Sequence, residues 1–124
     1  MPPCPCHSGK PYADCCQSFH LGFPPPTALA LMRSRYSAYA LGLVDYIIHT
    51  THSAKKPDRK EIEAFCNVTR FADLEILDVD EKEDEASIKF KATLLQGKHD
   101  VSFVEKSAFI KENNHWFYVS GCIN

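Results

Sequence analysis

The first half of the chain spaces its apolar residues as helices do. One run follows a proline spacer at 24–26 and has apolar residues at intervals of three, four and three: Leu29, Met32, Tyr36 and Tyr39. This spacing predicts a helix with one apolar face. Thr27 stands at the position of a helix cap, and Gly42 stands where the helix should end. A second, shorter helix is predicted over 44–51, with Ile47 and Ile48 available for burial.

A third helix is predicted to begin at Asp58. Asp58 and Glu61 stand in the order of a capping box, in which two side chains satisfy free backbone N–H groups at a helix start. Ile62, Phe65 and Cys66 follow at helical spacing. The chain therefore begins with about three helices before its pattern changes.

From about Phe71 onward, apolar and polar residues alternate as they do in strands. The first strand closes in an acidic turn at 80–85, and the second has five apolar residues on one face: Ala86, Ile88, Phe90, Ala92 and Leu94. Gly97 marks a turn before a third strand over 101–111, and Asn113 and Asn114 form a hairpin turn before a last strand over 116–120. This order predicts an α+β domain, with about three helices packed on a curved four-stranded antiparallel sheet.

The segment 1–22 follows neither pattern, and it holds four of the six cysteines of the chain: Cys4, Cys6, Cys15 and Cys16. The residues between these cysteines are too polar to form a core. A metal dication held by thiolates would give such a segment a fixed structure. We therefore expect two units, a zinc-binding knuckle over 1–22 and an α+β domain over 27–124, joined by the proline spacer.

Zinc fits this cluster because structural zinc sites take four thiolates in a tetrahedron and leave no position for water. We expect all four cysteines to bind one structural Zn2+, with Gly9 allowing the chain to reverse between the two pairs. Three alternatives stay open at this stage. In the first, the thiols are joined in disulfides; in the second, they carry no ligand; in the third, His7 or His20 replaces Cys16 at the metal.

Composition and charge narrow the partners of this 124-residue chain. Fourteen basic and sixteen acidic residues leave a formal charge of −2, which argues against a nucleic-acid partner. No apolar stretch is long enough to cross a membrane and the first residues lack the pattern of a secretion signal, so we expect a cytoplasmic protein. A local basic run without interleaved aromatic residues is typical of a solvated face: Lys55, Lys56, Arg59 and Lys60. Cys66 and Cys122 lie among apolar residues, and we expect both to be buried.

The cysteine segment resembles the SEC-C motif, a short zinc-binding sequence at the C-terminus of many bacterial SecA motors. That motif runs Cys-x-Cys-x-Ser-Gly, then a basic and an aromatic residue, and ends in Cys followed by Cys or His. Ser8, Gly9, Lys10 and Tyr12 match its middle part, and His7 stands where the motif usually has glycine. The SecA segment contacts a chaperone partner, so the resemblance implies a protein partner here, contacted through Lys10 and Tyr12.

The resemblance extends to the rest of the chain, which looks like the YchJ family of small bacterial SEC-C proteins. It is carried by these stretches: 31–39, with the string Arg33-Ser34-Arg35-Tyr36, 45–46, 51–52, 105–109 and 116–121. The body of that family resembles the nuclear transport factor two-like, cystatin-type fold. The resemblance therefore implies the same order of helices and strands, and it implies no particular activity.

A second site is predicted between the helices and the sheet. Arg35 lies beside the apolar face of the first helix, and Glu105 has the strand parity of Phe103 and Phe109, so both can point inward. A buried carboxylate needs a partner, and we expect Arg35 to pair with it. Such a pocket would be lined by seven residues: Arg35, Tyr39, Tyr46, His52, Glu105, Trp116 and Tyr118.

Two interpretations of this second site compete. In the first, a structural ion pair lies in a filled aromatic core, and the protein is a non-catalytic zinc-binding adaptor. In the second, an open pocket of roughly a few hundred Å³ binds a small ligand or carries an enzyme. Glu105 or His52 would then be the acid or base, and Arg35 would hold an anion. We favour the adaptor, with no catalytic residue; RNA binding, a third hypothesis, predicts a steep salt dependence.

Overall fold

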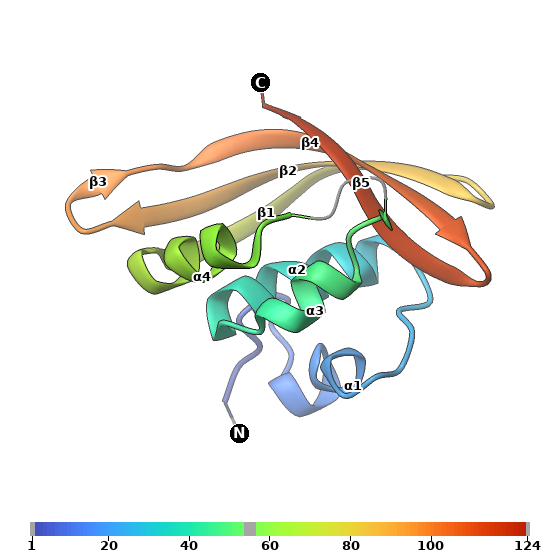
Figure 1. Cartoon of the computed structure of the whole chain (residues 1–124), viewed down its shortest axis with the longest axis horizontal. Coiled ribbons are helices and arrows are strands. Elements are labelled where there is room, and N and C mark those ends of the chain that lie inside the picture. The colour runs from blue at the N-terminus through green and yellow to red at the C-terminus, as the bar shows by residue number, and fades with distance from the viewer. Residues whose placement is uncertain (1, 54–56, 124) are drawn as a thin grey trace.

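The structure is a computed structural model that describes residues 2–53 and 57–123. The helices cover one face of a long curved sheet, and the N-terminal segment lies on the side of the helices away from the sheet (Figure 1). That segment contains the short 3-10 helix η1 (Tyr12–Asp14) and α1 (Gln17–His20). The helical layer consists of α2 (Ala28–Leu41), α3 (Val44–His49) and α4 (Arg59–Val68).

The sheet is antiparallel throughout and has the strand order β1-β2-β4-β5, with the short β3 paired to β2. Its strands are β1 (Arg70–Glu81), β2 (Glu85–Gln96), β3 (His99–Asp100), β4 (Phe103–Glu112) and β5 (His115–Ile123). The α+β class and the helices on a curved sheet are confirmed. The two-residue β3, which follows the turn at Gly97, adds a fifth strand to the predicted four.

The predicted ends of α2 are confirmed by their geometry. The Thr27 side chain accepts a hydrogen bond from the Ala30 N–H at 3.0 Å, and Gly42 has a φ of 73° in the left-handed region. At the start of α4, the Asp58 side chain accepts from the Lys60 N–H at 2.8 Å.

The helix α3 ends at His49, earlier than predicted, because the next residues pair with β5. The Tyr118 N–H donates to the Thr50 carbonyl at 2.9 Å, and the His52 N–H donates to the Tyr118 carbonyl at 2.8 Å. These two bonds fix the segment after α3 to the outer edge of the sheet.

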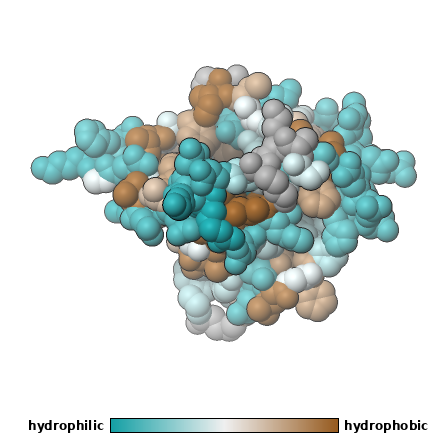
Figure 2. Space-filling view, in the orientation of Figure 1, coloured by the Kyte–Doolittle hydropathy of each residue, from teal (hydrophilic) through white to brown (hydrophobic). Residues whose placement is uncertain are grey.

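The main core lies between α2 and the concave face of the sheet. It joins residues of α2 to inward-facing strand residues, among them Leu31, Met32, Ile88, Leu94 and Phe109. Alternation along β2 decides which side chains take part, since every second residue faces the helices. On the face shown in Figure 2, hydrophobic residues reach the surface only in separate small areas among hydrophilic ones.

The structure also tests the predictions for the two remaining cysteines, the basic run and membrane-spanning helices. Cys66 is half-buried, whereas Cys122 near the end of β5 is exposed, so the prediction that Cys122 is buried is wrong. In the basic run, Arg59 forms an ion pair with Asp45, Lys60 is exposed, and positions 55 and 56 lie outside the described residues. Within the described part of the chain, no helix is long and apolar enough to cross a membrane.

Candidate metal centre and internal cavity

A small hairpin presents the first two cysteines. The Cys4 N–H donates to the Lys10 carbonyl at 2.9 Å, and the Tyr12 N–H donates to the Pro2 carbonyl at 3.0 Å, which closes the loop between them. Gly9 has a φ of 88°, as a chain reversal at this point requires. His7 also has a positive φ, 61°, which explains why the motif usually has glycine there.

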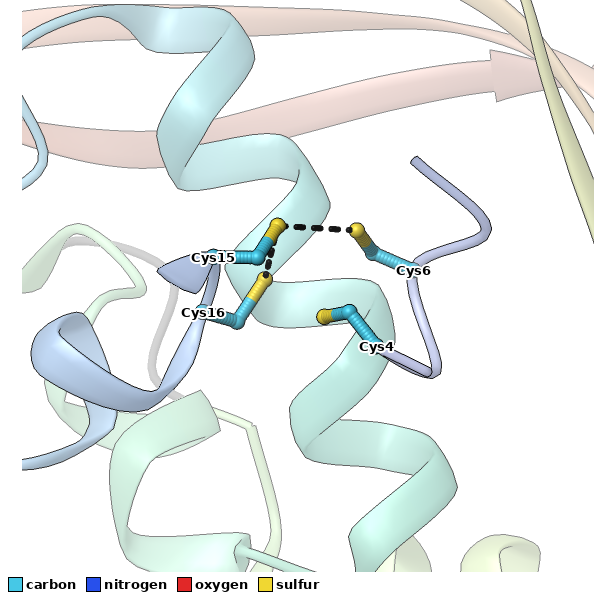
Figure 3. A group of neighbouring side chains, drawn as sticks. All are labelled: Cys4, Cys6, Cys15 and Cys16. Atoms are coloured by element: carbon cyan, nitrogen blue, oxygen red, sulfur yellow. Dashed lines mark hydrogen bonds between the residues drawn. The ribbon is translucent and has the colours of Figure 1, made fainter. Parts of the chain in front are cut away.

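The second pair of cysteines lies at the junction of η1 and α1, and all four sulfur atoms converge beside α2 (Figure 3). The four Sγ atoms lie within 4.8 Å of one another. The Cys6 and Cys15 sulfurs are 3.5 Å apart, and the Cys15 and Cys16 sulfurs are 3.9 Å apart. Because a tetrahedron with metal–sulfur bonds of about 2.3 Å has sulfur–sulfur edges of roughly 3.8 Å, this cluster has the size of a four-thiolate metal site.

The cluster replaces a hydrophobic core in this segment. Cys4, Cys6 and Cys16 are the buried residues of a separate small cluster, against which Tyr12 and Cys15 pack. A hydrogen bond from the Cys16 thiol lowers the pKa of Cys6 to about 4, and the same interaction raises the pKa of Cys16. Burial raises the pKa of Cys4. Cys6 therefore forms a thiolate readily while Cys4 and Cys16 hold their protons, and a bound cation is the partner that favours the loss of those two protons.

Neither histidine of the segment lies in the sulfur cluster, because both make other contacts. His20 Nε2 donates to the Ser34 carbonyl at 2.8 Å, so Nδ1 accepts from the Tyr12 hydroxyl at 2.6 Å. Burial lowers the pKa of His20. The His7 ring packs edge-on against Tyr36, with 5.8 Å between the ring centroids.

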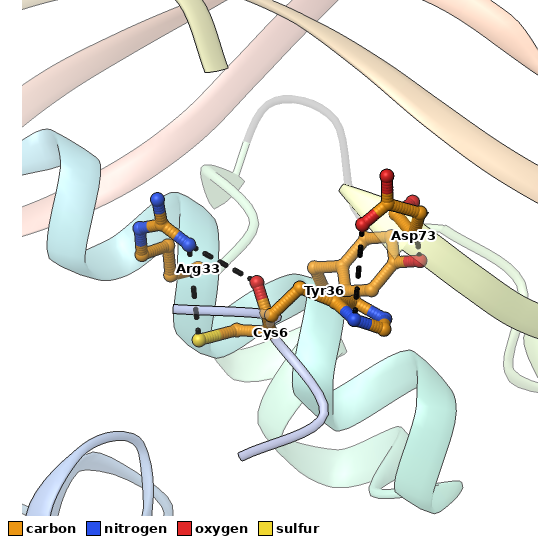
Figure 4. A network of polar contacts seen from close by, with 5 residues as sticks. Cys6, Arg33, Tyr36 and Asp73 are labelled. Carbon is orange, nitrogen blue, oxygen red and sulfur yellow. Dashed lines mark hydrogen bonds and ion pairs between the residues drawn. The ribbon is translucent and has the colours of Figure 1, made fainter. Parts of the chain in front are cut away.

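Helix α2 carries the contacts between the cysteine segment and the body. Arg33 Nη1 donates to the Cys6 carbonyl at 3.0 Å and lies 4.0 Å from the Cys6 sulfur (Figure 4). Three residues further along the helix, the Tyr36 hydroxyl donates to the Asp73 carbonyl of β1 at 2.8 Å. Of the two residues predicted to contact a partner, Lys10 is exposed, whereas Tyr12 turns its hydroxyl inward to His20.

A cavity of about 450 Å³ lies between α2, α4 and the concave face of the sheet. Four of the seven residues predicted to form a pocket line it: Arg35, Tyr39, Glu105 and Tyr118. Phenylalanines from α4 and from three strands complete most of its wall: Phe65, Phe71, Phe90, Phe103 and Phe109. Spacing along the chain does not single out these phenylalanines, because core residues and cavity-lining residues recur with the same period.

The other three predicted pocket residues lie elsewhere. The Tyr46 hydroxyl lies 2.7 Å from Ser34 Oγ, on the side of α2 that carries the cysteine segment. His52 Nε2 lies 3.2 Å from a Glu112 carboxylate oxygen, and Trp116 is buried with the Lys111 ammonium over its ring. The cavity thus shares four residues with the predicted pocket, and most of its other lining residues are apolar.

Arg35 does not pair with Glu105 as the sequence suggested. Its Nη1 donates to the Ile47 carbonyl at 3.0 Å and to the Thr50 and Thr51 hydroxyls at 2.8 and 3.0 Å. The guanidinium lies over the Tyr118 ring at 4.5 Å from its centroid. Burial lowers the pKa of Arg35 and raises that of Tyr118 to about 12. The end of α3 therefore supplies the polar partners, which no spacing rule would have identified.

Glu105 is positioned by its neighbours on the sheet. Its carboxylate accepts a hydrogen bond from the Ser107 hydroxyl. On the adjacent strand, a β-carbon at Gly121 would lie 2.3 Å from Glu105 Oε2, so the carboxylate occupies space that only glycine leaves open. Glu105 thus faces the cavity from β4 while Arg35 faces it from α2.

Fold and cysteine cluster together define a class, a small α+β protein of the nuclear transport factor two-like type that carries a four-cysteine motif. Two family descriptions match the chain: "YchJ, middle NTF2-like domain" over residues 27–121 and "SEC-C motif" over residues 3–18. The chain therefore belongs to the YchJ family of SEC-C proteins, as its resemblance to that family indicated.

Relatives and solved structures agree with this assignment. A UPF0225 protein of Chromobacterium violaceum is 39% identical over 126 residues, covering 97% of this chain and 92% of the relative. A UPF0225 protein of Bordetella pertussis is 36% identical over 124 residues, with the same coverage of 97% and 92%. The solution structure of a SEC-C motif containing protein from Rhodopseudomonas palustris has a TM-score of 0.89 and 34% identity, covering 96% of each chain. A crystal structure of such a protein from Psychrobacter arcticus has a TM-score of 0.84 and 29% identity, covering 98% of this chain and 82% of its own.

Proposed function

We propose that this protein is a non-catalytic, cytoplasmic adaptor whose N-terminal knuckle, residues 1–22, is built on one structural Zn2+. The observation that carries the proposal is the convergence of four sulfurs within 4.8 Å in a segment that has no other core. Four thiolates would hold the zinc and leave no position for a reacting water, so the metal would shape the knuckle and take no part in chemistry. The knuckle then offers a fixed surface to a partner protein.

Metal content tests the first half of this proposal. The reduced full-length chain is expected to carry one zinc per molecule by native mass spectrometry, and Cys4→Ser is expected to lose it. Cys122→Ser is the matched control, because Cys122 is an exposed cysteine far from the cluster along the chain and should leave the zinc in place. A reduced chain without bound metal would refute the zinc site.

The partner half is tested with a variant that keeps the metal. Lys10 is exposed on the second arm of the knuckle hairpin, so Lys10→Glu should reverse the charge of the contact surface without touching a thiol. We expect a partner captured from cell extract by the intact chain to be lost with Cys4→Ser and weakened with Lys10→Glu. A partner retained by both variants would not bind the knuckle, and the adaptor role would then be wrong.

A second function, binding of a small ligand by the body, is favoured by the cavity. A volume of about 450 Å³ falls within the range of roughly 300–1,000 Å³ that small-molecule sites have. The absence of an Arg35–Glu105 ion pair among the described residues also removes the filled, ion-paired core that would have argued against a ligand. This function is compatible with the adaptor role, since knuckle and cavity lie on opposite sides of α2.

A further inference from the structure

Three charged residues line the cavity. Glu61 on α4 is exposed, and the two less exposed charges, those of Arg35 and Glu105, are opposite in sign and are not paired with each other. Within the described chain, neither Arg35 nor Glu105 forms an ion pair with any residue, although both line the cavity. Arg35 uses Nη1 for its three hydrogen bonds, and its Nε and Nη2 have no acceptor among the described residues. Because Arg35 is buried and Glu105 is half-buried, leaving both charges without an ion-pair partner is costly, so a molecule that bridges them would gain from both.

The charge balance selects the kind of molecule. Arg35 donates hydrogen bonds only, and the Glu105 carboxylate accepts them, so a bridging group needs an acceptor and a donor side by side. A neutral group leaves the two protein charges balanced, whereas an anion beside Glu105 or a cation beside Arg35 meets repulsion. A primary amide is a small neutral group that carries an acceptor oxygen and a donor N–H side by side along one edge.

The rest of the wall selects the body of the molecule. Apart from its three charged residues and Ser107, the cavity is lined by apolar and aromatic side chains, including Met32, Phe65, Phe71 and Leu94. Such a wall favours a flat aromatic body over a sugar or a polyphosphate, because those would bury polar groups without partners.

We propose that this cavity binds a neutral, flat aromatic molecule that carries an amide-like edge, with its acceptor at Arg35 and its donor at Glu105. The inference rests on the second proposed function, ligand binding by the body, and specifies its chemistry. It assigns Arg35 and Glu105 as the residues that determine specificity, and the phenylalanines as the residues that supply most of the contact area.

Four matched probes test the inference on the full-length chain: 2-naphthamide, 2-naphthoate, 2-naphthylmethylammonium and 2-acetonaphthone. They share one ring system and differ in charge and in the presence of a donor. Binding is measured by amide NMR shifts, which also locate the probe. We expect the amide to bind about tenfold or more tightly than the other three, because each of those leaves a buried group unpaired or repelled.

Two variants then change the preference in opposite directions. Glu105→Gln removes one charge without changing the shape, so naphthoate should gain affinity relative to the ammonium probe. Arg35→Met should favour the ammonium probe, and its fold is checked first because Arg35 also holds the end of α3. Lys89→Met, an exposed change on β2, is the control and should bind all four probes as the unchanged chain does.

The outcomes separate the two levels of the proposal. If no probe binds in the cavity, ligand binding by the body fails and this inference fails with it. If probes bind there but a charged probe or the ketone equals the amide, ligand binding stands and the amide preference is overturned. An unchanged order of affinities in Glu105→Gln would also overturn it, whether or not Arg35→Met folds.

Discussion

The knuckle and the body of this protein reach fixed structures by different physical means. The body buries a continuous apolar cluster between α2 and the sheet, with Leu31, Ile88 and Phe109 almost fully inaccessible. The buried residues of the knuckle cluster are Cys4, Cys6 and Cys16, and the other described residues of the segment are half-buried or exposed. The body can therefore fold by the hydrophobic effect, whereas the knuckle needs an additional source of free energy.

The contrast is visible in what joins the two regions. The contacts across the boundary combine hydrogen bonds, from Arg33 to the Cys6 carbonyl and from His20 to the Ser34 carbonyl, with ring contacts of two histidines, His7 on Tyr36 and His20 on Tyr46. Polar contacts of this kind fix an orientation and contribute modestly to stability. Each region should consequently respond to its own perturbation and leave the other largely unchanged.

The largest effect expected from the proposed zinc site is that removal of the zinc unfolds the knuckle alone. Apparent binding free energies of structural zinc are about 10–16 kcal/mol, which exceeds what a segment of this length gains by packing. In Cys4→Ser, or after chelation, we expect residues 1–22 to unfold while the body stays folded. Hydrogen exchange should show lost protection at the knuckle amides, such as that of Cys4, and unchanged protection in β2 and β4.

A body that melts together with the knuckle would show that the two regions form one cooperative unit. Circular dichroism before and after chelation distinguishes the cases, because the sheet signal belongs to the body. Cys122→Ser, treated in the same way, controls for a general effect of losing a thiol.

The converse perturbation weakens the body and spares the knuckle. Ile88 on β2 is fully buried, and Ile88→Ala should destabilise the body by about 2–5 kcal/mol through lost burial and the cavity that remains. Urea unfolding followed by the fluorescence of Trp116, the one tryptophan of the chain, measures this loss. The chelator concentration at which half of the zinc is released should stay the same in Ile88→Ala. Val79→Ala, on the exposed side of β1, is the control and should change neither the unfolding of the body nor the release of zinc.

The sequence predicted these two regions unequally well, and the reason is physical. Helices, strands and their ends follow from local rules, so Thr27, Gly42 and the turn at Asn113 and Asn114 could be identified from spacing alone. The four cysteines could be identified as a group because thiols in a polar segment have few other uses. Long-range choices were not predictable in this way.

The errors at the cavity come from such long-range choices. Arg35 could pair with a carboxylate or with backbone and hydroxyl oxygens, and the turn after α3 brought Thr50 and Thr51 within reach. Strand parity placed Glu105 inward, but it could not reveal the space that Gly121 leaves for the carboxylate. Periodicity also does not distinguish an aromatic residue that fills a core from one that lines a cavity.

A smaller effect is expected at the boundary between the regions. His20→Ala removes the hydrogen bonds to Tyr12 and Ser34 and should weaken docking of the knuckle by about 1–3 kcal/mol, without changing the zinc content. Hydrogen exchange at knuckle amides reports this docking, and His49→Ala, at an exposed histidine of α3, is the control. Docking as firm as in the unchanged chain would mean that the remaining contacts, those of Arg33 with the Cys6 carbonyl and of His7 with Tyr36, hold the knuckle to α2 without His20.

The same histidine gives the boundary a pH dependence with a definite sign. Burial lowers the pKa of His20 below its ordinary value of 6.5, so the docked state binds fewer protons than the undocked state. The contribution of neutral His20 to docking of the knuckle is therefore fully present above about pH 6.5 and is lost as the pH falls below that value. In zinc-saturated protein, docking of the knuckle should weaken less in His20→Gln than in the unchanged chain as the pH falls below about 6.5. Hydrogen exchange at knuckle amides, compared at two pH values in both proteins, measures the difference.

The smallest expected effect is that of replacing His7, where backbone strain and side-chain contacts act in opposite directions on the stability of the knuckle. His7 has a φ of 61°, a conformation that costs a residue with a β-carbon about 1–2 kcal/mol. Glycine would remove this cost, but it would also lose two contacts of the His7 ring. These are its packing on Tyr36 and the approach of Nδ1 to Asp73 Oδ1 at 3.8 Å. Because the two terms oppose each other, we expect His7→Gly to change knuckle stability by less than about 1 kcal/mol.

His7→Val resolves the two terms, since valine keeps a β-carbon and is more restricted at positive φ. It loses the contacts of the histidine and keeps the strain, so it should be less stable than His7→Gly by about 1–2 kcal/mol. Zinc retention against a competing chelator measures the difference in both variants. If His7→Gly and His7→Val release zinc alike, the backbone at this position is not strained in solution, and contacts to Tyr36 and Asp73 decide the stability of the loop.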